Sequence, residues 1–280
     1  MTSIVLWVAV DAHGATSINL ASDSRISWSN AQKISHVWDY GRKLFASKKY
    51  PEILGYCGDV LFPSQVIGQI VEHIDTGILF DINDAPEIKL QKILKLVQQS
   101  FSNYPNNFSE WQGSEIVYCT RQNCDGKSTF RAWILRCTSD KKWSVGRPLR
   151  IPNTSGIIEI LGSGKTVVNK YFNKFNNSEL RGTSRIVFTA FCDALKSNED
   201  SRTGGVPQLV AIHRTGTAKS FGVIYNNKRF LLGLPVDQED KWEGVDWRNE
   251  LFERCDGMTM SVLDGAQRHA RPNGEKKSKI

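Results

Sequence analysis

The sequence predicts an α+β fold of the four-layer αββα type, in which two antiparallel β-sheets are flanked by helix pairs. Extended segments, two helical segments, extended segments, two helical segments and further extended segments follow one another along the chain. A chain of 280 residues with 40% hydrophobic content is long enough for a large core. No repeat or low-complexity linker divides it. Two sheets with helix pairs on their outer faces satisfy that order.

The first strands are expected close to the N-terminus. Residues 4–10 are an apolar run that Asp11 ends, and a glycine-containing turn leads to a second extended segment over 17–22. The run is too short to span a bilayer, and it lacks the basic start and the small-residue cleavage site of a signal peptide. We therefore expect a buried strand in a cytoplasmic protein that does not bind membranes.

Three short extended segments are expected next, at 33–38, 44–47 and 53–56, followed by two helices. Pro63 and Pro86 suit the first turns of these helices, where a backbone N–H has no partner within the helix. Apolar residues then recur at helical spacing. Those expected on the buried faces are Val66, Ile70, Ile74, Leu90, Ile93, Leu94, Val97 and Phe101.

A β-hairpin that turns at Asp125-Gly126 is expected after these helices. Two helices follow, one after Gly164 and one after Thr183, whose hydroxyl can cap the helix start. The remaining expected strands cover residues 115–120, 130–137, 208–213, 219–225 and 230–232.

One domain is expected over residues 1–232, with an extension over 233–280 where the pattern weakens. Trp242 and Trp247 suggest that part of the extension packs, and the last ten or so residues read as disordered. The roles of the 121–130 hairpin and of the extension stay open.

Composition argues against several other classes of protein. The net charge is +7, but the basic residues are scattered apart from a cluster at 276–279, so a solubilising tail is favoured over a nucleic-acid site. The six cysteines show no paired spacing, and no fourth ligand suits a zinc knuckle at Cys119, Cys124 and Cys137. We expect no metal, no cofactor and no nucleic-acid partner.

The N-terminus offers a reactive group. Removal of Met1 would leave a free α-amine on Thr2, which places a hydroxyl nucleophile and its own base in one residue. An α-amine titrates at about 7.7–8.0, so it can act as a base near neutrality. Such a site also needs a lysine ammonium, a carboxylate to hold that lysine, and backbone N–H groups for the oxyanion.

Residues of these kinds follow along the chain. Asp23 ends the second extended segment, Lys43 precedes a short strand, Gly58 follows the next one, and Ser163 lies between two glycines at a helix start. The motifs are Thr2-Ser3-Ile4-Val5, Ala21-Ser22-Asp23-Ser24-Arg25, Arg42-Lys43, Leu54-Gly55-Tyr56-Cys57-Gly58, Leu161-Gly162-Ser163-Gly164, Asp200 and Thr203-Gly204-Gly205-Val206-Pro207.

Each residue also has a simpler interpretation. Taken alone, Asp23 with Arg25 favours a surface ion pair, and Lys43, in a basic stretch, is equally a solvated lysine, with Lys33 as a competitor for the activating role. The other simple interpretations are a turn glycine for Gly58, a helix cap for Ser163 and a loop carboxylate for Asp200.

Taken in order, the motifs resemble those of proteasome β subunits and the bacterial HslV peptidase, which are N-terminal nucleophile hydrolases. The resemblance covers most of residues 2–232 and implies a threonine endopeptidase. It implies that Thr2 is nucleophile and base, that Lys43 is the activating lysine, and that Asp23 is its partner. It further implies that Gly58 N–H binds the oxyanion, and that Ser163 and Asp200 orient the amine and a water; Thr203 stands where a serine is commoner.

The same resemblance implies a specificity pocket lined by Ile26, Tyr56 and Val60, which would be apolar. The sequence departs from the family pattern beside this pocket, because Asp59 follows Gly58 where a second glycine is usual. The shape of the substrate cleft is therefore not given by the resemblance.

The resemblance also implies partners: a peptide or protein substrate, a homo-oligomeric ring, and a separate ATPase or regulatory protein for any unfolding of substrates. Two alternatives stay open. One is an N-terminal nucleophile amidase that acts on small molecules, and the other is a non-catalytic ring or scaffold subunit.

Overall fold

The chain enters the fold through a hairpin in the larger of two β-sheets. In the computed structural model, β1 (Ser3–Asp11) pairs antiparallel with β2 (Gly14–Ser22). The other strands of this sheet are β10 (Gly156–Gly162), β11 (Gln208–His213), β12 (Ala218–Tyr225), β13 (Lys228–Leu231), β14 (Leu234–Pro235), β15 (Trp247–Asn249) and β16 (Arg254–Cys255). The structure describes residues 2–30, 33–105, 111, 113–124, 126–138, 140–237, 243–268 and 271.

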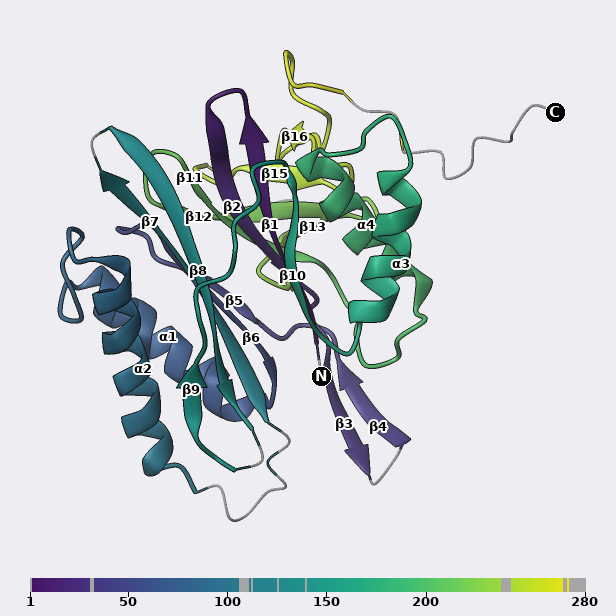
Figure 1. Cartoon of the computed structure of the whole chain (residues 1–280). Helices are drawn as coiled ribbons and strands as arrows, with labels where there is room; N and C mark the ends of the chain where they lie inside the picture. The colour runs from purple at the N-terminus through teal and green to yellow at the C-terminus, as the bar shows by residue number, and fades with distance from the viewer. Residues whose placement is uncertain are drawn as a thin grey trace.

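The second sheet is an antiparallel meander. Its strands follow one another in chain order: β5 (Leu44–Ala46), β6 (Glu52–Gly58), β7 (Ser114–Cys124), β8 (Lys127–Cys137) and β9 (Trp143–Val145). A separate two-stranded hairpin, β3 (Ile26–Asn30) and β4 (Lys33–Trp38), projects from the end of the molecule where the N-terminus lies (Figure 1).

The two sheets pack face to face through apolar side chains. Strand residues alternate between faces, so Ile4 and Leu6 of β1 point towards the second sheet, whereas Val5 and Trp7 point away from it. From the second sheet, Ile53 of β6 belongs to the same cluster as Ile4. An apolar layer therefore separates the sheets and ends beneath Thr2 and Gly58.

Helices cover the outer faces, as Figure 1 shows. The helices are α1 (Leu61–Asp75), α2 (Pro86–Ser102), α3 (Lys165–Asn176) and α4 (Ser184–Ser197). The first two share an apolar cluster with Tyr56 and Tyr118 of the second sheet, and the last two share one with Val5 and Trp7 of the first. The predicted α+β class is confirmed.

Most predicted elements are confirmed, with differences at their ends. Every residue assigned to the buried faces of the first two helices is buried. α1 begins at Leu61, which still leaves Pro63 in the first turn, where no helical N–H bond is lost. Thr183 precedes α4, but its hydroxyl donates to Leu180 O and does not cap the helix. The strands β3, β9, β10, β14, β15 and β16 were not predicted.

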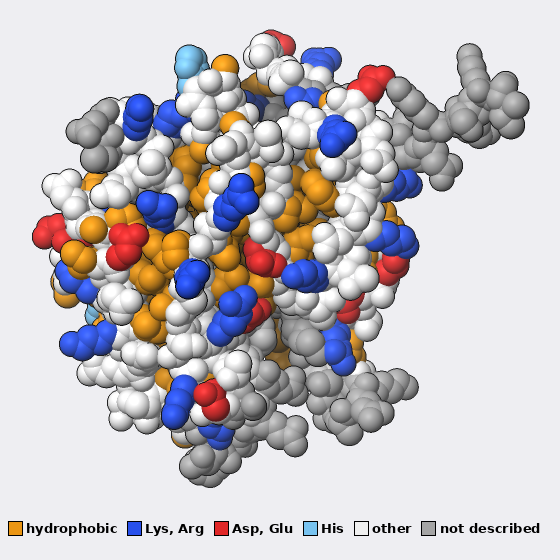
Figure 2. All heavy atoms as spheres, in the orientation of Figure 1, with side chains coloured by type: hydrophobic (Ala, Val, Ile, Leu, Met, Phe, Trp, Pro, Cys, Tyr) orange, Lys and Arg blue, Asp and Glu red, His pale blue; other side chains and the backbone are white. Residues whose placement is uncertain are grey.

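Part of the C-terminal extension joins the larger sheet. β15 pairs in parallel with β12, and Trp247 lies over Gly222, where a Cβ would fall 2.3 Å from the indole ring. The packing predicted for Trp247 is confirmed, because the side chain is buried. Trp242 and the last nine residues lie outside the described residues. On the face shown in Figure 2, lysine and arginine side chains are spread among acidic and neutral ones.

Candidate active site

Thr2 lies at the start of β1 and faces the second sheet. It has the same parity as Ile4 and Leu6, whose side chains enter the layer between the sheets. Its hydroxyl is buried and has no hydrogen-bond partner among the described residues. Gly162 lies beside it, and a Cβ there would fall 1.7 Å from Thr2 O, so only glycine allows this approach. The hydroxyl predicted from the sequence to be the nucleophile is thus buried and has no partner in the part of the chain that the structure describes.

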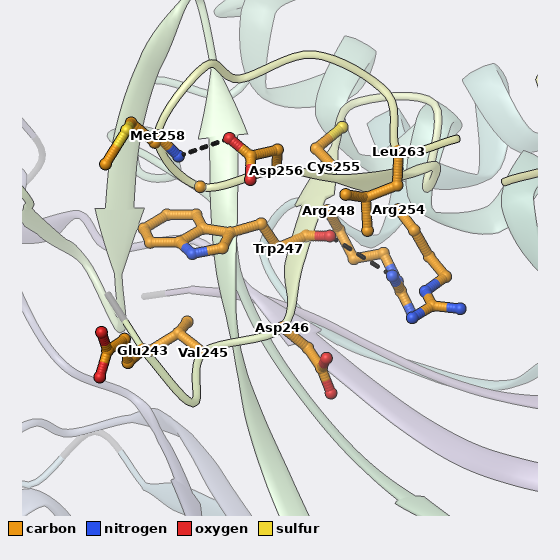
Figure 3. Close-up of a pocket in the computed structure, with 11 residues that line it drawn as sticks. Glu243, Val245, Asp246, Trp247, Arg248, Arg254, Cys255, Asp256, Met258 and Leu263 are labelled. Carbon is orange, nitrogen blue, oxygen red and sulfur yellow. Dashed lines mark hydrogen bonds between the residues drawn. The ribbon is translucent and has the colours of Figure 1, made fainter. Parts of the chain in front are cut away.

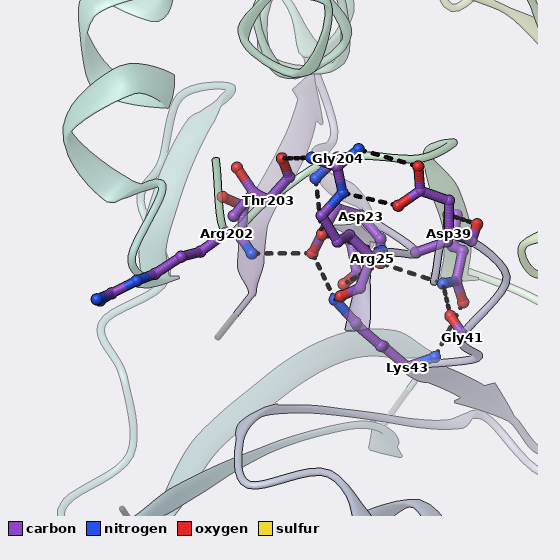
Figure 4. A network of polar contacts seen from close by, with 12 residues as sticks. Asp23, Arg25, Asp39, Gly41, Lys43, Arg202, Thr203 and Gly204 are labelled. Carbon is purple, nitrogen blue, oxygen red and sulfur yellow. Dashed lines mark hydrogen bonds and ion pairs between the residues drawn. The ribbon is translucent and has the colours of Figure 1, made fainter. Parts of the chain in front are cut away.

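Asp23 is the centre of a buried polar network at the end of β2 (Figure 4). Its Oδ1 accepts hydrogen bonds from Ser3 N–H at 3.0 Å and from Lys43 Nζ at 2.9 Å. Its Oδ2 accepts from the backbone N–H groups of Arg25 at 3.2 Å and Gly204 at 3.1 Å. Because each oxygen has two donors, the carboxylate is held in one orientation.

The simpler interpretation of Asp23 as the surface partner of Arg25 is wrong. Asp23 is fully buried, and the Arg25 guanidinium pairs instead with Asp39, Nε to Oδ1 at 2.7 Å and Nη2 to Oδ2 at 2.9 Å. This pair joins the two ends of the β3–β4 hairpin. Ser24 supports it, because its hydroxyl donates to Asp39 O at 2.6 Å.

Lys43 is fully buried, so the solvated interpretation is wrong for it as well. Its ammonium donates to Asp23 Oδ1 and to Arg25 O, which are its hydrogen-bond partners among the described residues. Burial lowers the pKa of Lys43, and the charge of Asp23 opposes that shift. The side chain of its competitor, Lys33, lies outside the described residues.

Gly58 ends β6 in a conformation that requires glycine. Its φ is +96°, and a Cβ would fall 2.4 Å from Gly113 O. Asp59 follows, its N–H donating to Gly113 O at 3.0 Å. Burial raises the pKa of the Asp59 carboxyl, whose Oδ1 has no hydrogen-bond partner among the described residues.

Ser163 connects β10 to α3 and does not cap that helix. The residue before α3 is Gly164, no side chain caps the helix start, and the Ser163 hydroxyl is buried without a partner among the described residues. A Cβ on Gly164 would collide with Ser3 Oγ and come within 3.2 Å of a methyl of Thr203. The turns that carry Ser163 and Thr203 therefore meet at β1, beside Thr2.

Asp200 lies in the turn after α4 and is only partly satisfied. Its Oδ1 accepts the N–H of Arg202 at 3.0 Å, whereas Oδ2 is buried and unpartnered among the described residues. The Thr203 hydroxyl donates to Asp200 O at 3.4 Å. Buried polar atoms without partners are rare in native proteins, and strain, a catalytic role or a bound water or ion can account for them.

A pocket of ≈ 630 Å³ opens at this end of the molecule, with Gly58 and Ser163 in its lining. None of Ile26, Tyr56 and Val60 is among its described lining residues. Tyr56 is enclosed in the core beneath α1 and α2, and its hydroxyl donates to Arg42 O at 3.1 Å. Val60 packs against the same core, and Ile26 lies against Gly41.

Searches against protein-family models and against curated proteins find no match. Among solved structures, HslV from Trypanosoma brucei is 12% identical, with a TM-score of 0.44, 75% of this chain covered and 99% of that chain. An Anbu Gly-1 mutant from Hyphomicrobium sp. strain MC1 is 13% identical, with a TM-score of 0.46, and Anbu (ancestral beta-subunit) from Yersinia bercovieri is 11% identical, with a TM-score of 0.48. For both, coverage is 79% of this chain and 87% of that chain.

At these identities and TM-scores we draw no conclusion from the likenesses about fold or activity. The candidate active site is therefore assigned from the contacts and burial of its own residues. Within the described residues, no cluster of histidine, cysteine and acidic side chains could hold a metal ion. No described helix is long and apolar enough to cross a bilayer.

A second pocket, of ≈ 540 Å³, lies in the C-terminal extension (Figure 3). Trp247 lies between Val245 on one side and Asp256 and Met258 on the other. None of the residues predicted for the catalytic site or the specificity pocket is among the described residues that line this pocket. Trp247, which was predicted only to pack, is one of the lining residues.

Sequence reasoning missed Gln208, which connects the parts of the network. This buried side chain accepts from Lys43 N–H at 3.1 Å and donates to Asp23 O at 3.2 Å and Gly41 O at 2.7 Å. It thereby fixes the backbone that carries both members of the ion pair. In the sequence, the only sign of its role is that Gln208 is a polar residue at the first position of an apolar strand. Asp39 and Ser24 left no signal, because their partners are backbone and distant side chains.

Proposed function

We propose that this protein is an N-terminal threonine hydrolase that cleaves peptide bonds with Thr2 after removal of Met1. The observation that supports this best is the buried Asp23 carboxylate, which binds both Lys43 Nζ and the Ser3 N–H next to Thr2. An N-terminal nucleophile needs a lysine ammonium nearby and a carboxylate that holds this lysine. The Asp23–Lys43 ion pair, fixed beside the first residues of β1, supplies both groups.

In the proposed reaction, the free Thr2 amine takes the hydroxyl proton as Oγ1 attacks the substrate carbonyl. The Gly58 N–H stabilises the oxyanion. Collapse expels the leaving amine, which receives the proton, and forms an ester on Thr2. A water then gives its proton to the α-amine and attacks the ester, which releases the acid and restores the hydroxyl. Ser163 and Asp200, each with an oxygen that has no partner among the described residues, orient the amine and this water.

The αββα sandwich and self-assembly belong to the same proposal. Three apolar clusters support the sandwich: one between the sheets and one beneath each helix pair. We also propose a homo-oligomeric ring, in which repeated head-to-tail contacts close. Light scattering coupled to gel filtration is expected to give a mass several times 31.5 kDa. A monomer would count against the ring and favour the small-molecule amidase.

The decisive experiment measures intact mass before and after treatment with a peptide epoxyketone. That reagent needs the hydroxyl and the free amine of one residue, so a single adduct reports both. We expect loss of Met1 and one adduct in wild type and in Thr2→Ser, and none in Thr2→Ala. Retained Met1 without an adduct would contradict the proposal and leave a non-catalytic scaffold subunit.

A further inference from the structure

The pocket beside Gly58 contains one charged cluster that the proposed mechanism does not use. On the second sheet, Cys57, Glu115 and Arg136 lie opposite one another on adjacent strands, β6, β7 and β8. Residues of the same parity, such as Val117 and Ile134, face the first sheet. Alternation therefore directs these three side chains into the space between the sheets, where all three line the pocket.

The cluster presents hydrogen-bond donors to the pocket. Arg136 Nε donates to Glu115 Oε1 at 2.7 Å, and the thiol of Cys57 donates to Glu115 Oε2 at 3.4 Å. Burial raises the pKa of Cys57, which keeps the thiol protonated as a donor. Each oxygen of Glu115 thus accepts one hydrogen bond. The terminal nitrogens of Arg136 have no partner among the described residues, and its side chain is 46% exposed against 29% for Glu115.

The rest of the lining favours a ligand that accepts hydrogen bonds. Gly58, Gly113 and Gly162 line the pocket with φ values of +96°, +88° and +86°. A Cβ at any of these positions would come close to neighbouring backbone, so this part of the lining is main chain without side chains. The Ser163 hydroxyl, unpartnered among the described residues, is also in the lining.

We propose that this pocket binds a carboxylate carried by the substrate next to the bond that is cleaved, and that Arg136 selects it. A guanidinium whose Nε edge is already held can bind a carboxylate through its terminal nitrogens in bidentate geometry. A cationic group is disfavoured at those nitrogens, because it would meet the positive charge of Arg136. The position of the bond relative to the pocket rests on the proposed function of Thr2, whereas the affinity for carboxylates does not.

Removal of Arg136 is expected to leave the fold intact, because exposed ion pairs contribute little to stability. Arg131 provides a matched control on the same strand. It is an exposed arginine five positions away, so it lies on the opposite face of β8 and outside the pocket. Arg131→Gln changes the net charge exactly as much as Arg136→Gln does.

The experiment measures binding of short acetylated peptides to the Thr2→Ala protein by calorimetry. The peptides differ only in a central Glu, Gln or Lys. We expect the Glu peptide to bind about tenfold more tightly than the Gln peptide, with that preference lost in Arg136→Gln and kept in Arg131→Gln. Absence of binding, absence of a Glu preference, or equal loss in Arg131→Gln would overturn the proposal.

The same peptides are then tested on the protein that keeps Thr2, so that failure of this proposal can be distinguished from failure of the proposed function. If the same peptides are cleaved, kcat/KM is expected to favour Glu beside the cleaved bond, and Arg136→Gln is expected to remove that preference without removing the epoxyketone adduct. If binding depends on Arg136 but neither cleavage nor adduct occurs, the carboxylate pocket stands and the proposed hydrolase does not. Cleavage with no acidic preference at any position overturns the pocket proposal alone.

Discussion

At the scale of single residues, the centre of the candidate site consists of charged side chains that are fully buried in the core. Asp23 and Lys43 are both fully buried, and such a pair is maintained because each charge compensates the other. Gly58 and Gly162 have conformations and neighbours that exclude a side chain. The polar atoms left without described partners, on Thr2, Ser163 and Asp200, lie around this rigid centre.

Lys43→Met is expected to lower the free energy of unfolding by about 3–5 kcal/mol, because the Asp23 carboxyl group would stay buried without its cation. Epoxyketone labelling of Thr2 is expected to be lost as well. Urea unfolding measures the first effect and intact mass the second. Lys48→Met, at an exposed lysine, is the control, and equal stability of the two variants would contradict the buried pair.

Gly58→Ala is expected to cost about 1–3 kcal/mol, because its backbone would be strained and its methyl would overlap Gly113 O. Gly68→Ala is the contrasting control. Gly68 lies within α1, where an added Cβ makes an ordinary contact with Phe45, and helical alanine is roughly 0.5–1 kcal/mol better than glycine. Thermal unfolding should thus move in opposite directions for the two variants, and a stabilised Gly58→Ala would refute this account.

At the scale of elements, hydrophobic periodicity predicted the features that depend on local sequence alone, such as helices and their buried faces. The faces of α1 and α2 were read correctly because one apolar stripe per helix meets one sheet. β10 was missed because Ile157, Ile158 and Ile160 alternate poorly and most of the strand is only partly buried. The network around Gln208 could not be predicted, since it joins residues more than a hundred positions apart that only the sheet brings together.

A second buried ion pair attaches α2 to the second sheet. Lys89 Nζ donates to Glu52 Oε1 at 2.9 Å, and Glu52 also accepts from Tyr118 and Thr120. Lys89→Met is expected to cost about 3–5 kcal/mol, because Glu52 would stay buried without its cation. Adding Glu52→Gln should recover much of the loss, since the glutamine oxygen can accept from one of the Tyr118 and Thr120 hydroxyls while its amide NH2 donates to the other. A double-mutant cycle in urea tests this, and additive losses would contradict it.

At the scale of the whole molecule, His213 lies where the two sheets meet. It ends β11, and Arg121 of β7 donates to its backbone carbonyl. Burial lowers the pKa of His213, Lys219, Arg248 and Arg121 lower it further, and Asp246 opposes them. The protein therefore binds this proton less readily when folded than when unfolded.

The consequence is a loss of stability in acid. The contribution of His213 is fully present above its unfolded pKa of about 6.5 and is lost as pH falls through the lower folded value. We expect His213→Gln to flatten the decline in unfolding free energy below that pH, measured by urea titration at several pH values. His73→Gln, at an exposed histidine of α1, should leave the decline unchanged. The same slope in all three proteins would exclude His213 as the cause.

The β3–β4 hairpin separates Asp23 from Lys43 along the chain, yet the two meet in space. Its two ends are joined by the Arg25–Asp39 ion pair and by the hydrogen bond from Gly41 N–H to Ser24 O. The distance between Asp23 and Lys43 is therefore set at the base of the hairpin and not by its length. An insertion or a deletion within the hairpin is therefore expected to leave the buried Asp23–Lys43 pair in place, which makes this segment a position where a foreign peptide can be inserted.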